Sequence, residues 1–508
     1  MHAFEWVIAL LVGAVVLTGV ARYLKLPYPS MLALGGVALA FVPNSPEFRL
    51  DPQLTLALFV APVLLDAAFD TSLRDLKRFW VPITALVIIA VGITTFAVAW
   101  LAHTLVPTMP WAAAIALGAV VAPPDAAAAS AILRSLQIPH RIVVILEGES
   151  LLNDATALLI YRIAVSVAMG ATFTPSGAGL QGLAMIGSVA AGFALAHLIT
   201  RVTRIIKDVP SAIVLQFATT FGIWIFADEV GLSAIVTVVV FAITAARITP
   251  TSTPPQLRLP SYAVWETSVF VLNVLAFVLI GLQVRPILMA LEPAERESYL
   301  RIALSVLGMV VFVRIAWVMF YNRAAKYKAR WFGAGYWPGR YTPTLNGSTV
   351  ISWCGMRGIV TLATSYALPD GFPHRDLIVL CAFTVVVGTL IVQGLTLRPL
   401  LSALHLTHDD TVKDEIHLAR EALAIVAAEI LDGDGSPIAE VLRVEFVVQP
   451  AVEEGGTISE RSARNDLRGR IFAAQRVALV RMRDTALIGD DAFHRIEERL
   501  DWAEVNVR

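Results

Sequence analysis

Two short polar stretches place carboxylates inside long apolar runs, where a charged side chain is costly. Ser150 and Asp154 stand four residues apart in Gly148-Glu149-Ser150-Leu151-Leu152-Asn153-Asp154-Ala155. On a helix, that spacing puts a hydroxyl oxygen beside the Asp154 carboxylate. A buried carboxylate holds either a proton or a cation, because the bare charge is disfavoured away from water. The stretch therefore predicts an ion-binding site; the other interpretation is a polar helix start in a loop.

Asp125 directly follows two prolines, Pro123 and Pro124, in a second apolar run. Proline donates no backbone hydrogen bond and clashes with the preceding turn, so the pair leaves carbonyl groups free upstream. Free carbonyls beside a carboxylate make an oxygen-lined pocket, which suits a hard cation such as Na⁺. We expect Asp125 to belong to the ion site; the alternative is a helix boundary with Asp125 as its N-cap.

Other polar residues in the apolar runs are expected to support the ion site. Arg357 lies between Gly355 and Gly358. A buried arginine needs an acid, so we predict a structural ion pair between Arg357 and Glu149. Asn153 forms hydrogen bonds without titrating. Asp66 either adds an oxygen to the cavity or bonds locally.

The elements that must position these residues are membrane spans. Of 508 residues, 57% are hydrophobic and 16% are charged, whereas an ordinary soluble domain has about 25% charged residues. Lysine and arginine (39) balance aspartate and glutamate (40), which excludes the basic surface of a nucleic-acid-binding protein. Thirteen apolar runs are near the length of about 20 residues that crosses a bilayer. They are residues 4–22, 28–44, 53–70, 80–103, 111–133, 142–168, 182–203, 210–228, 231–248, 262–283, 300–322, 346–368 and 376–402.

This pattern predicts an all-α polytopic membrane protein with a transmembrane domain over 1–404 and a soluble domain over 405–508. Most arginines and lysines of the first domain fall in one set of alternate loops, which places the N-terminus outside and the tail in the cytoplasm. Breaks at Pro123-Pro124 and at Gly355 and Gly358 fall in the fifth span of each of two six-span halves. Such paired interruptions indicate inverted repeats with two broken helices.

The tail is predicted to be a small helical module. Apolar residues favour helices over His417–Leu431 and Asn465–Leu487, and a last helix over Ala492–Val505 with Asp491 as its cap. The first helix ends at the turn-rich run 432–437, which lacks the ligand pattern of a calcium loop. The sequence does not indicate what this module senses.

Four stretches resemble the monovalent cation:proton antiporters, in the sodium/proton exchanger branch with the Asn-Asp motif. They are Gly148–Ala155, Leu26–Pro29, Trp265–Leu282 and Gly355–Val360. The resemblance implies a homodimer in which a core domain moves like an elevator, with the fifth and twelfth spans unwound and crossing. It implies that Asp154 binds the ion or proton, that Ser150 and Asp125 complete the site, and that Asp66 matches an acidic position. It also implies the ion pair of Glu149 with Arg357.

One departure from the family concerns the broken fifth span. The family has Thr-Asp-Pro where this chain has Pro124-Asp125-Ala126, so a threonine hydroxyl is lost. The backbone carbonyl of Pro124 remains a candidate ligand, and the preference among Na⁺, Li⁺ and K⁺ stays open.

Together these features predict a secondary transporter of the plasma (inner) membrane that exchanges Na⁺, Li⁺ or K⁺ for H⁺. It would serve pH homeostasis, with no enzymatic activity, no cofactor and no nucleic-acid partner. Because Asn153 cannot titrate, the exchange is expected to be electroneutral. Two alternatives remain: an intramembrane aspartyl protease using Asp125 and Asp154, and a gated ion channel or cation sensor.

Overall fold

The described part of the chain is built from helices. The computed structural model describes residues 2–43, 51–125, 138–171, 175–332, 343–404, 406, 409, 411–433, 437–443 and 458–505. No strand occurs within these ranges. This agrees with the all-α expectation.

The helices follow one another along the whole chain. The first part holds α1 (His2–Leu24), α2 (Tyr28–Ala40), α3 (Pro52–Thr55), the π-helical turn η1 (Leu56–Val60), α4 (Ala61–Phe69), α5 (Leu73–Arg78), α6 (Trp80–Thr84), the π-helical turn η2 (Ala85–Ala90), α7 (Val91–Leu105) and α8 (Trp111–Val121). Then come α10 (His140–Ala168), α11 (Pro175–Thr203), α12 (Val209–Glu229), α13 (Ala234–Ser252), α14 (Pro255–Leu282), α15 (Val284–Ala290), α16 (Arg296–Phe332), α17 (Leu345–Trp353), α18 (Ile359–Tyr366) and α19 (Arg375–Leu404). The tail holds α20 (Thr411–Asp432), α21 (Pro437–Arg443), α22 (Ile458–Asp484) and α23 (Asp490–Val505).

Several of these helices are long and apolar enough to cross a membrane. Among the described residues there are 8: Pro52–Phe69, Trp80–Leu105, His140–Ala168, Gly179–Thr203, Val209–Glu229, Pro255–Ala290, Arg296–Lys328 and Arg375–Leu404. Shorter apolar helices cover Ile8–Leu24, Tyr28–Ala40, Trp111–Val121 and Ala234–Thr249. The structure is therefore that of a multi-span protein, and the total of thirteen spans remains a prediction.

The two predicted interruptions are visible as helix ends. α8 stops at Val121, and the chain continues without helix to Asp125. The remainder of the predicted fifth span, 126–133, lies outside the described residues. α17 and α18 are separated by a non-helical stretch over 354–358. Both prolines and both glycines thus stand where the sequence expects the breaks.

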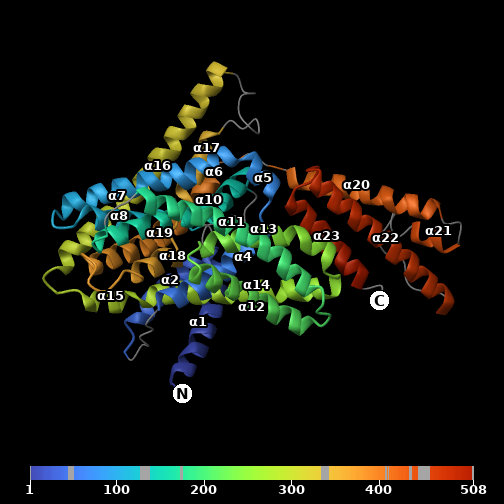
Figure 1. Ribbon diagram of the computed structural model, residues 1–508, viewed down its shortest axis with the longest axis horizontal. Coiled ribbons are helices and arrows are strands. Elements are labelled where there is room, and N and C mark those ends of the chain that lie inside the picture. The colour runs from blue at the N-terminus through green and yellow to red at the C-terminus, as the bar shows by residue number, and fades with distance from the viewer. Residues whose placement is uncertain are drawn as a thin grey trace.

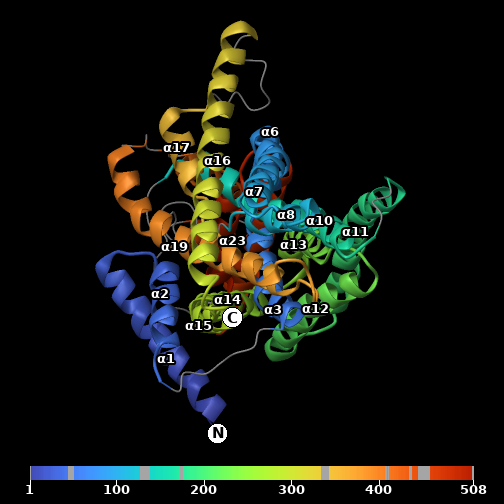
Figure 2. The ribbon, with the colours of Figure 1, turned by 90° about the vertical axis from the view of Figure 1, so that its left-hand side faces the viewer.

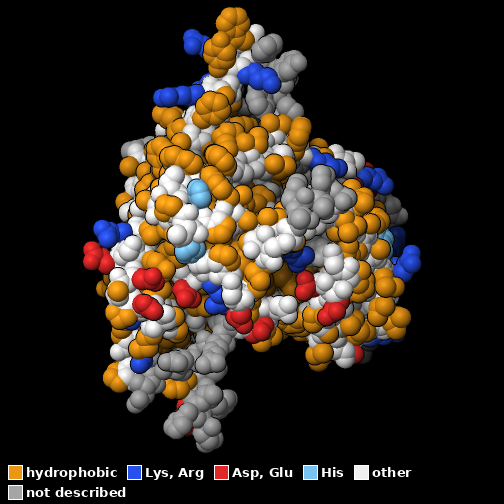
Figure 3. Space-filling view, turned by 60° about the vertical axis from the view of Figure 1, so that its left-hand side comes forward, with side chains coloured by type: hydrophobic (Ala, Val, Ile, Leu, Met, Phe, Trp, Pro, Cys, Tyr) orange, Lys and Arg blue, Asp and Glu red, His pale blue; other side chains and the backbone are white. Residues whose placement is uncertain are grey.

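The outer face of the helical body is rich in apolar side chains. Figure 3 shows orange side chains over much of the visible surface, with basic side chains at the tip formed by the end of α16. Ile186, Phe312 and Val214 are each about two-thirds exposed. An exposed apolar surface of this extent suits contact with lipid. Figures 1 and 2 both show the end of α16 projecting beyond its neighbours.

The tail helices gather at one end of the bundle. Figure 1 shows α20, α22 and α23 beside one another, away from the loop between α7 and α8. Phe472, Leu479 and Phe493 belong to an apolar cluster formed by these three helices. α23 begins at Asp490, so the predicted cap Asp491 lies inside its first turn. The helices predicted for the tail otherwise match those observed to within a few residues at most of their ends.

Charged contacts join the tail to the membrane helices. Arg258 of α14 is 1% exposed, and its guanidinium binds Asp501 and lies 2.7 Å from the Oε1 of Glu497. Arg483 of α22 donates to the Ala246 and Arg247 carbonyl oxygens of α13 at 3.3 and 3.1 Å. Burial makes such pairs costly to break, because a lone charge would remain inside the protein.

A second set of contacts reaches α5 and the start of α10. Arg74 lies 2.8 Å from Glu415 of α20. His140, the first residue of α10, lies 3.1 Å from Asp75 and 3.2 Å from Asp491. The tail therefore contacts α10, which carries Asp154, and also α13 and α14.

A histidine of the tail makes this docking sensitive to pH, in addition to His140. His494 of α23 stacks on Phe69 of α4, with 6.1 Å between ring centroids. Burial opposes protonation, but the hydrogen bond to Glu497 and the nearby charges of Asp70 and Asp490 outweigh it and raise the pKa of His494. The pKa of Asp491 is also raised, here by burial itself, because burial disfavours the charged carboxylate. The docked tail thus binds protons more readily than an undocked tail.

We expect the docked tail to become less stable as pH rises through the folded pKa of His494. A group with a raised folded pKa stabilises the folded form below its ordinary pKa, and this contribution is lost at higher pH. For one proton, the docking equilibrium changes by at most about tenfold per pH unit. Spin labels at Lys77→Cys and Arg499→Cys, both exposed positions, report the tail distance across pH.

The matched control is the same labelled pair with His494→Gln. It should reduce the pH dependence near neutrality, and the part that remains is assigned to His140, which contacts Asp491 of the tail. Asp75 and Asp409 have lowered pKa values despite burial, so their contributions are lost only at acid pH. A distance distribution that narrows as pH rises from 6 to 9 would contradict the expected loss of docking at high pH.

Candidate functional site

The two interruptions meet at the centre of the bundle. The backbone N–H of Asp125 donates to the Met356 carbonyl oxygen at 2.7 Å, which ties the end of α8 to the break between α17 and α18. Gly358 lies against the Asp125 carboxylate so closely that a Cβ at this position would overlap it. The glycine is therefore required for Asp125 to sit at the start of α18, where the helix dipole favours a negative charge.

Arg357 satisfies the backbone carbonyls that the first break sets free. Its Nε donates to the Val121 carbonyl oxygen at 3.1 Å, and its Nη2 donates to that of Ala122 at 3.2 Å. Its Nη1 donates to the Gly355 carbonyl oxygen, and its backbone N–H donates to Thr389. The predicted ion pair with Glu149 is wrong, because this guanidinium is occupied by carbonyl groups of both breaks.

Glu149 instead pairs with Arg314 of α16. The two carboxylate oxygens accept from Nη1 and Nη2 at 2.6 and 2.9 Å, and Nη2 also donates to the Ile351 carbonyl oxygen. Glu149 is 1% exposed and Arg314 is 4% exposed. Sequence reasoning missed Arg314, although an arginine in the middle of an apolar run signals a buried acid nearby. It could not tell which of two buried arginines would reach Glu149.

Four of the predicted site residues line one cavity. This cavity, which we name the tail-side cavity, has a volume of about 420 Å³ and is bounded by Asp66, Asp125, Ser150 and Asp154. They come from α4, the end of the first break and α10. Asp154 is 8% exposed and forms no ion pair with any described residue. Oxygen atoms on several helices therefore surround a space large enough for a partly hydrated cation.

Pro124 and Asn153 bond to each other beside this cavity and do not line it. The Asn153 amide is fully buried and donates from Nδ2 to the Pro124 carbonyl oxygen at 2.7 Å. Pro124 is not among the residues that line the cavity, whereas Pro123 is. This amide fixes the non-helical segment that follows α8 beside Asp154. A role of the Pro124 oxygen as an ion ligand remains a prediction.

Further polar residues line the tail-side cavity besides the predicted set. They include Glu147, Glu266, Asn273 and Asp70, and Arg22 is the one basic residue among the described residues that line this cavity. Glu266 and Asn273 lie seven residues, or two turns, apart on α14, so both face the cavity beside the apolar Val269, Phe270 and Phe277 of the same helix. These acids give the cavity a negative lining that attracts cations. The signal in the sequence was the same as for Asp66, an acid within an apolar run.

The ligand set is small for a permanently bound metal. Within the described ranges, no three His, Cys, Asp or Glu side chains group closely enough to hold a metal ion. Asp154, Asp125 and Ser150 offer two carboxylates and one hydroxyl. A set of this size suits a cation that is bound and then released.

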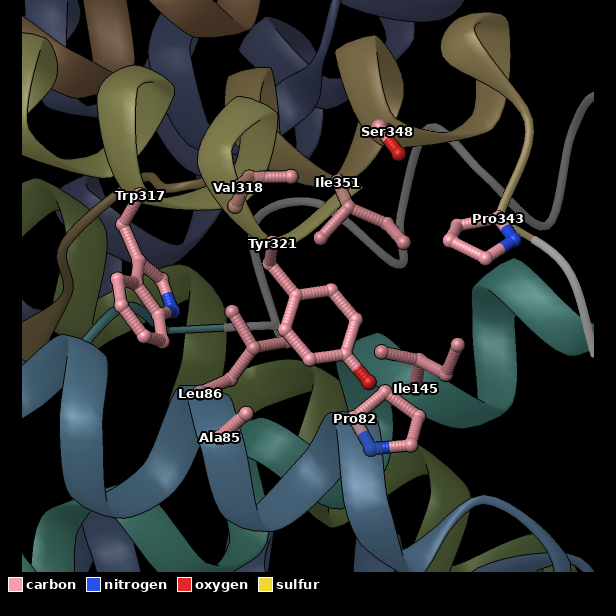
Figure 4. A pocket seen from close by; sticks show the side chains of 10 residues that line it. All are labelled: Pro82, Ala85, Leu86, Ile145, Trp317, Val318, Tyr321, Pro343, Ser348 and Ile351. Atoms are coloured by element: carbon pink, nitrogen blue, oxygen red, sulfur yellow. The ribbon is translucent and has the colours of Figure 1, made fainter. Parts of the chain in front are cut away.

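A separate small pocket lies between α16, α6 and α10. Figure 4 shows it lined by Leu86, Ile145, Trp317 and other residues, with Tyr321 and Ser348 supplying hydroxyl groups. None of the labelled residues is charged. This pocket does not resemble an ion site.

Comparison with known proteins gives a consistent assignment. Residues 7–403 match the family described as sodium/hydrogen exchanger, transmembrane. An uncharacterized Na⁺/H⁺ exchanger of Escherichia coli strain K12 is 30% identical over 94% of this chain and 94% of its own length. A sodium, potassium, lithium and rubidium/H⁺ antiporter of Bacillus subtilis is 30% identical over 79% of this chain and 62% of its own length.

The fold also matches a solved structure. The sodium proton antiporter from Methanocaldococcus jannaschii at pH 8 superposes with a TM-score of 0.60 at 16% identity, covering 80% of this chain and 99% of that one. At this identity the likeness concerns the fold alone.

Removing the partner of Glu149 should destabilise the protein strongly. Arg314→Leu leaves a buried carboxylate unpaired, which costs about 3–5 kcal/mol. The matched control is Arg162→Leu, because Arg162 and Asp228 form a pair in which both side chains are about half exposed. Exposed pairs contribute about 0–1 kcal/mol. Unfolding of the purified protein in detergent by increasing denaturant measures both variants, and equal losses would contradict the structural role of Arg314.

Proposed function

The chain belongs to the transmembrane sodium/hydrogen exchanger family, a family of cation/proton exchangers, and we propose that it exchanges Na⁺ for H⁺ at Asp154. The observation that carries this proposal is the tail-side cavity, where Asp154, Asp125 and Ser150 meet at two interrupted helices. Arg357 donates to carbonyl groups freed by the first break, and Asp154 forms no ion pair within the described ranges, which supports Asp154 as the group that binds the transported cation.

The proposed mechanism is competition at one carboxylate. Burial makes a bare charged Asp154 costly, so the group is neutralised either by a proton or by a cation. The neutralised site crosses the membrane, whereas the empty charged site is held back by the cost of desolvation. Asp125 and Ser150 complete the cation shell, and Asp66 adds an oxygen from α4.

Asn153 supports a one-for-one stoichiometry. Its amide cannot titrate and is fixed by the Pro124 carbonyl oxygen. One cation then replaces one proton at Asp154, and no net charge moves. We accordingly propose electroneutral exchange.

Several wider features belong to the same proposal. The chain has a transmembrane domain over 1–404 and a cytoplasmic domain over 405–508, with the N-terminus outside the plasma membrane. It works as a homodimer whose core moves as an elevator. The name of the Bacillus subtilis relative supports testing K⁺, Li⁺ and Rb⁺ beside Na⁺.

The family match argues against the two alternatives that the sequence left open, an intramembrane aspartyl protease and an ion channel or cation sensor. Membership of a transport family favours ion exchange over peptide cleavage by Asp125 and Asp154. A channel would pass current without counter-movement of protons, so its flux would follow an imposed voltage.

Asp154→Asn should abolish exchange. The amide cannot bind a proton or balance a cation, so transport in reconstituted vesicles should fall to background, a loss of about 100-fold or more. The control is Asp376→Asn, an exposed acid at the start of α19. Vesicle uptake of Na⁺ with a pH-sensitive dye measures both. Exchange retained by a folded Asp154→Asn variant would place the ion site elsewhere.

The stoichiometry is tested separately by voltage. At fixed ion and proton gradients, a potential imposed with valinomycin and K⁺ should leave the Na⁺/H⁺ exchange rate unchanged, because no net charge moves in a one-for-one cycle. A parallel run at the same K⁺ gradient without valinomycin separates the effect of the voltage from any exchange of K⁺ itself. A rate that rises several-fold with an imposed potential of either sign would overturn electroneutral exchange.

A further inference from the structure

A line of three cavities passes through Asp154. The tail-side cavity ends at Asp154. Opposite the tail lies a second cavity of about 380 Å³, which we name the far-side cavity and which includes Gln181 and the Arg162–Asp228 pair. Between them is a third space of about 10 Å³, bounded by Asp154 on one side and by Tyr161 and Thr364 on the other. Because Tyr161 and Thr364 line the far-side cavity as well, the three spaces adjoin one another.

The two hydroxyl groups in this passage are buried without a partner among the described residues. Tyr161 is 7% exposed and Thr364 is 3% exposed, and neither hydroxyl has a hydrogen-bond partner in the part of the chain that the structure describes. Burying a hydroxyl without a partner costs about 1–3 kcal/mol. A threonine in a neighbouring helix, Thr200 of α11, instead bonds back to the carbonyl oxygen of Ala196 one turn earlier. The cost borne at Tyr161 and Thr364 calls for an explanation.

The surroundings leave these hydroxyls as the main polar features of the passage. Apart from Asp154, the other residues that line the small space are alanine, valine, leucine and proline. Its volume is near that needed for one water molecule. A hydrated cation cannot pass a space of this size, so the tail-side and far-side cavities are not joined for ions in this conformation.

We propose that Tyr161 and Thr364 form a relay site for the transported ion between Asp154 and the far-side cavity. This proposal rests on the exchange function proposed above. It adds the route by which the ion reaches or leaves Asp154 on the side opposite the tail. When the passage widens, each hydroxyl supplies an oxygen to a Na⁺ that has lost part of its hydration shell. Each can equally bond a water molecule that carries a proton to or from Asp154. The buried Oε1 of Gln181, also without a partner among the described residues, is the next oxygen along this route.

Removing both hydroxyls tests the relay. The double variant Tyr161→Phe with Thr364→Val keeps the shape of the passage but removes its oxygens. The maximal exchange rate in vesicles should fall about tenfold or more, as expected when hydrogen bonds to a charged species are lost. The apparent affinity for Na⁺ added on the tail side should change less than about twofold, because that cavity is untouched.

The matched control is Thr95→Val. Thr95 is 4% exposed, its hydroxyl also lacks a partner among the described residues, and it lines none of the three cavities. This control should exchange at the wild-type rate. A double variant as fast as Thr95→Val would overturn the relay, and so would a loss confined to tail-side Na⁺ affinity.

Labelling of introduced cysteines gives a readout that does not need transport. The native Cys354 and Cys381 are 2% and 0% exposed, so they contribute little background. In oriented vesicles, a membrane-impermeant thiol reagent on the far side should label Gln181→Cys and, more slowly, Thr364→Cys. Val63→Cys, on the tail-side cavity, should be labelled from the tail side alone.

The outcomes separate the two proposals. Failure of the wild-type protein to exchange any cation would refute the proposed function, whatever the labelling shows. Active exchange with a Thr364→Cys that reacts only from the tail side would refute the relay and leave the exchange function standing.

Discussion

The structure depends on the need to satisfy backbone groups where two helices are interrupted inside a membrane. No water is available there to bond free carbonyls, and each unsatisfied group costs several kcal/mol. Arg357 meets this need by donating to the carbonyl oxygens of Val121, Ala122 and Gly355. The Asp125 N–H and the Asn153 amide close the remaining gaps between the two breaks. These bonds thereby hold the two breaks at fixed positions relative to each other.

This arrangement divides the buried charges into two kinds. Glu149 and Arg314 neutralise each other in a bidentate pair that links α10 to α16. Arg357 is directed toward carbonyl groups. Asp154 forms no ion pair with an arginine in the described part of the chain, and it lines the tail-side cavity. A carboxylate that the protein leaves without an ion pair is one that a proton or a cation can neutralise, which is the chemistry an exchanger needs.

The tail adds a connection between parts of the membrane bundle that are distant in sequence. Its helices contact the first residue of α10 through His140, and they contact α13 and α14 through Arg483 and Arg258. The tail helices therefore bind both α10 and α14, which lie on different sides of the tail-side cavity. Any movement of α10 relative to α14 has to change these contacts, so the protonation of His494 bears on the same movement.

The sequence by itself determined the kind of protein and the position of its breaks. Composition and apolar run lengths required a membrane bundle, proline and glycine marked the interruptions, and acids in apolar runs identified Asp154, Asp125, Ser150 and Asp66. These are local signals, because helix formation and the cost of burying charge act residue by residue. The structure alone decided the partners: Arg314 rather than Arg357 for Glu149, carbonyl groups for Arg357, and the adjacency of Tyr161 and Thr364 to Asp154. Partners of this kind depend on how helices pack across more than a hundred residues, and two buried arginines look alike in sequence until packing gives one of them the acid.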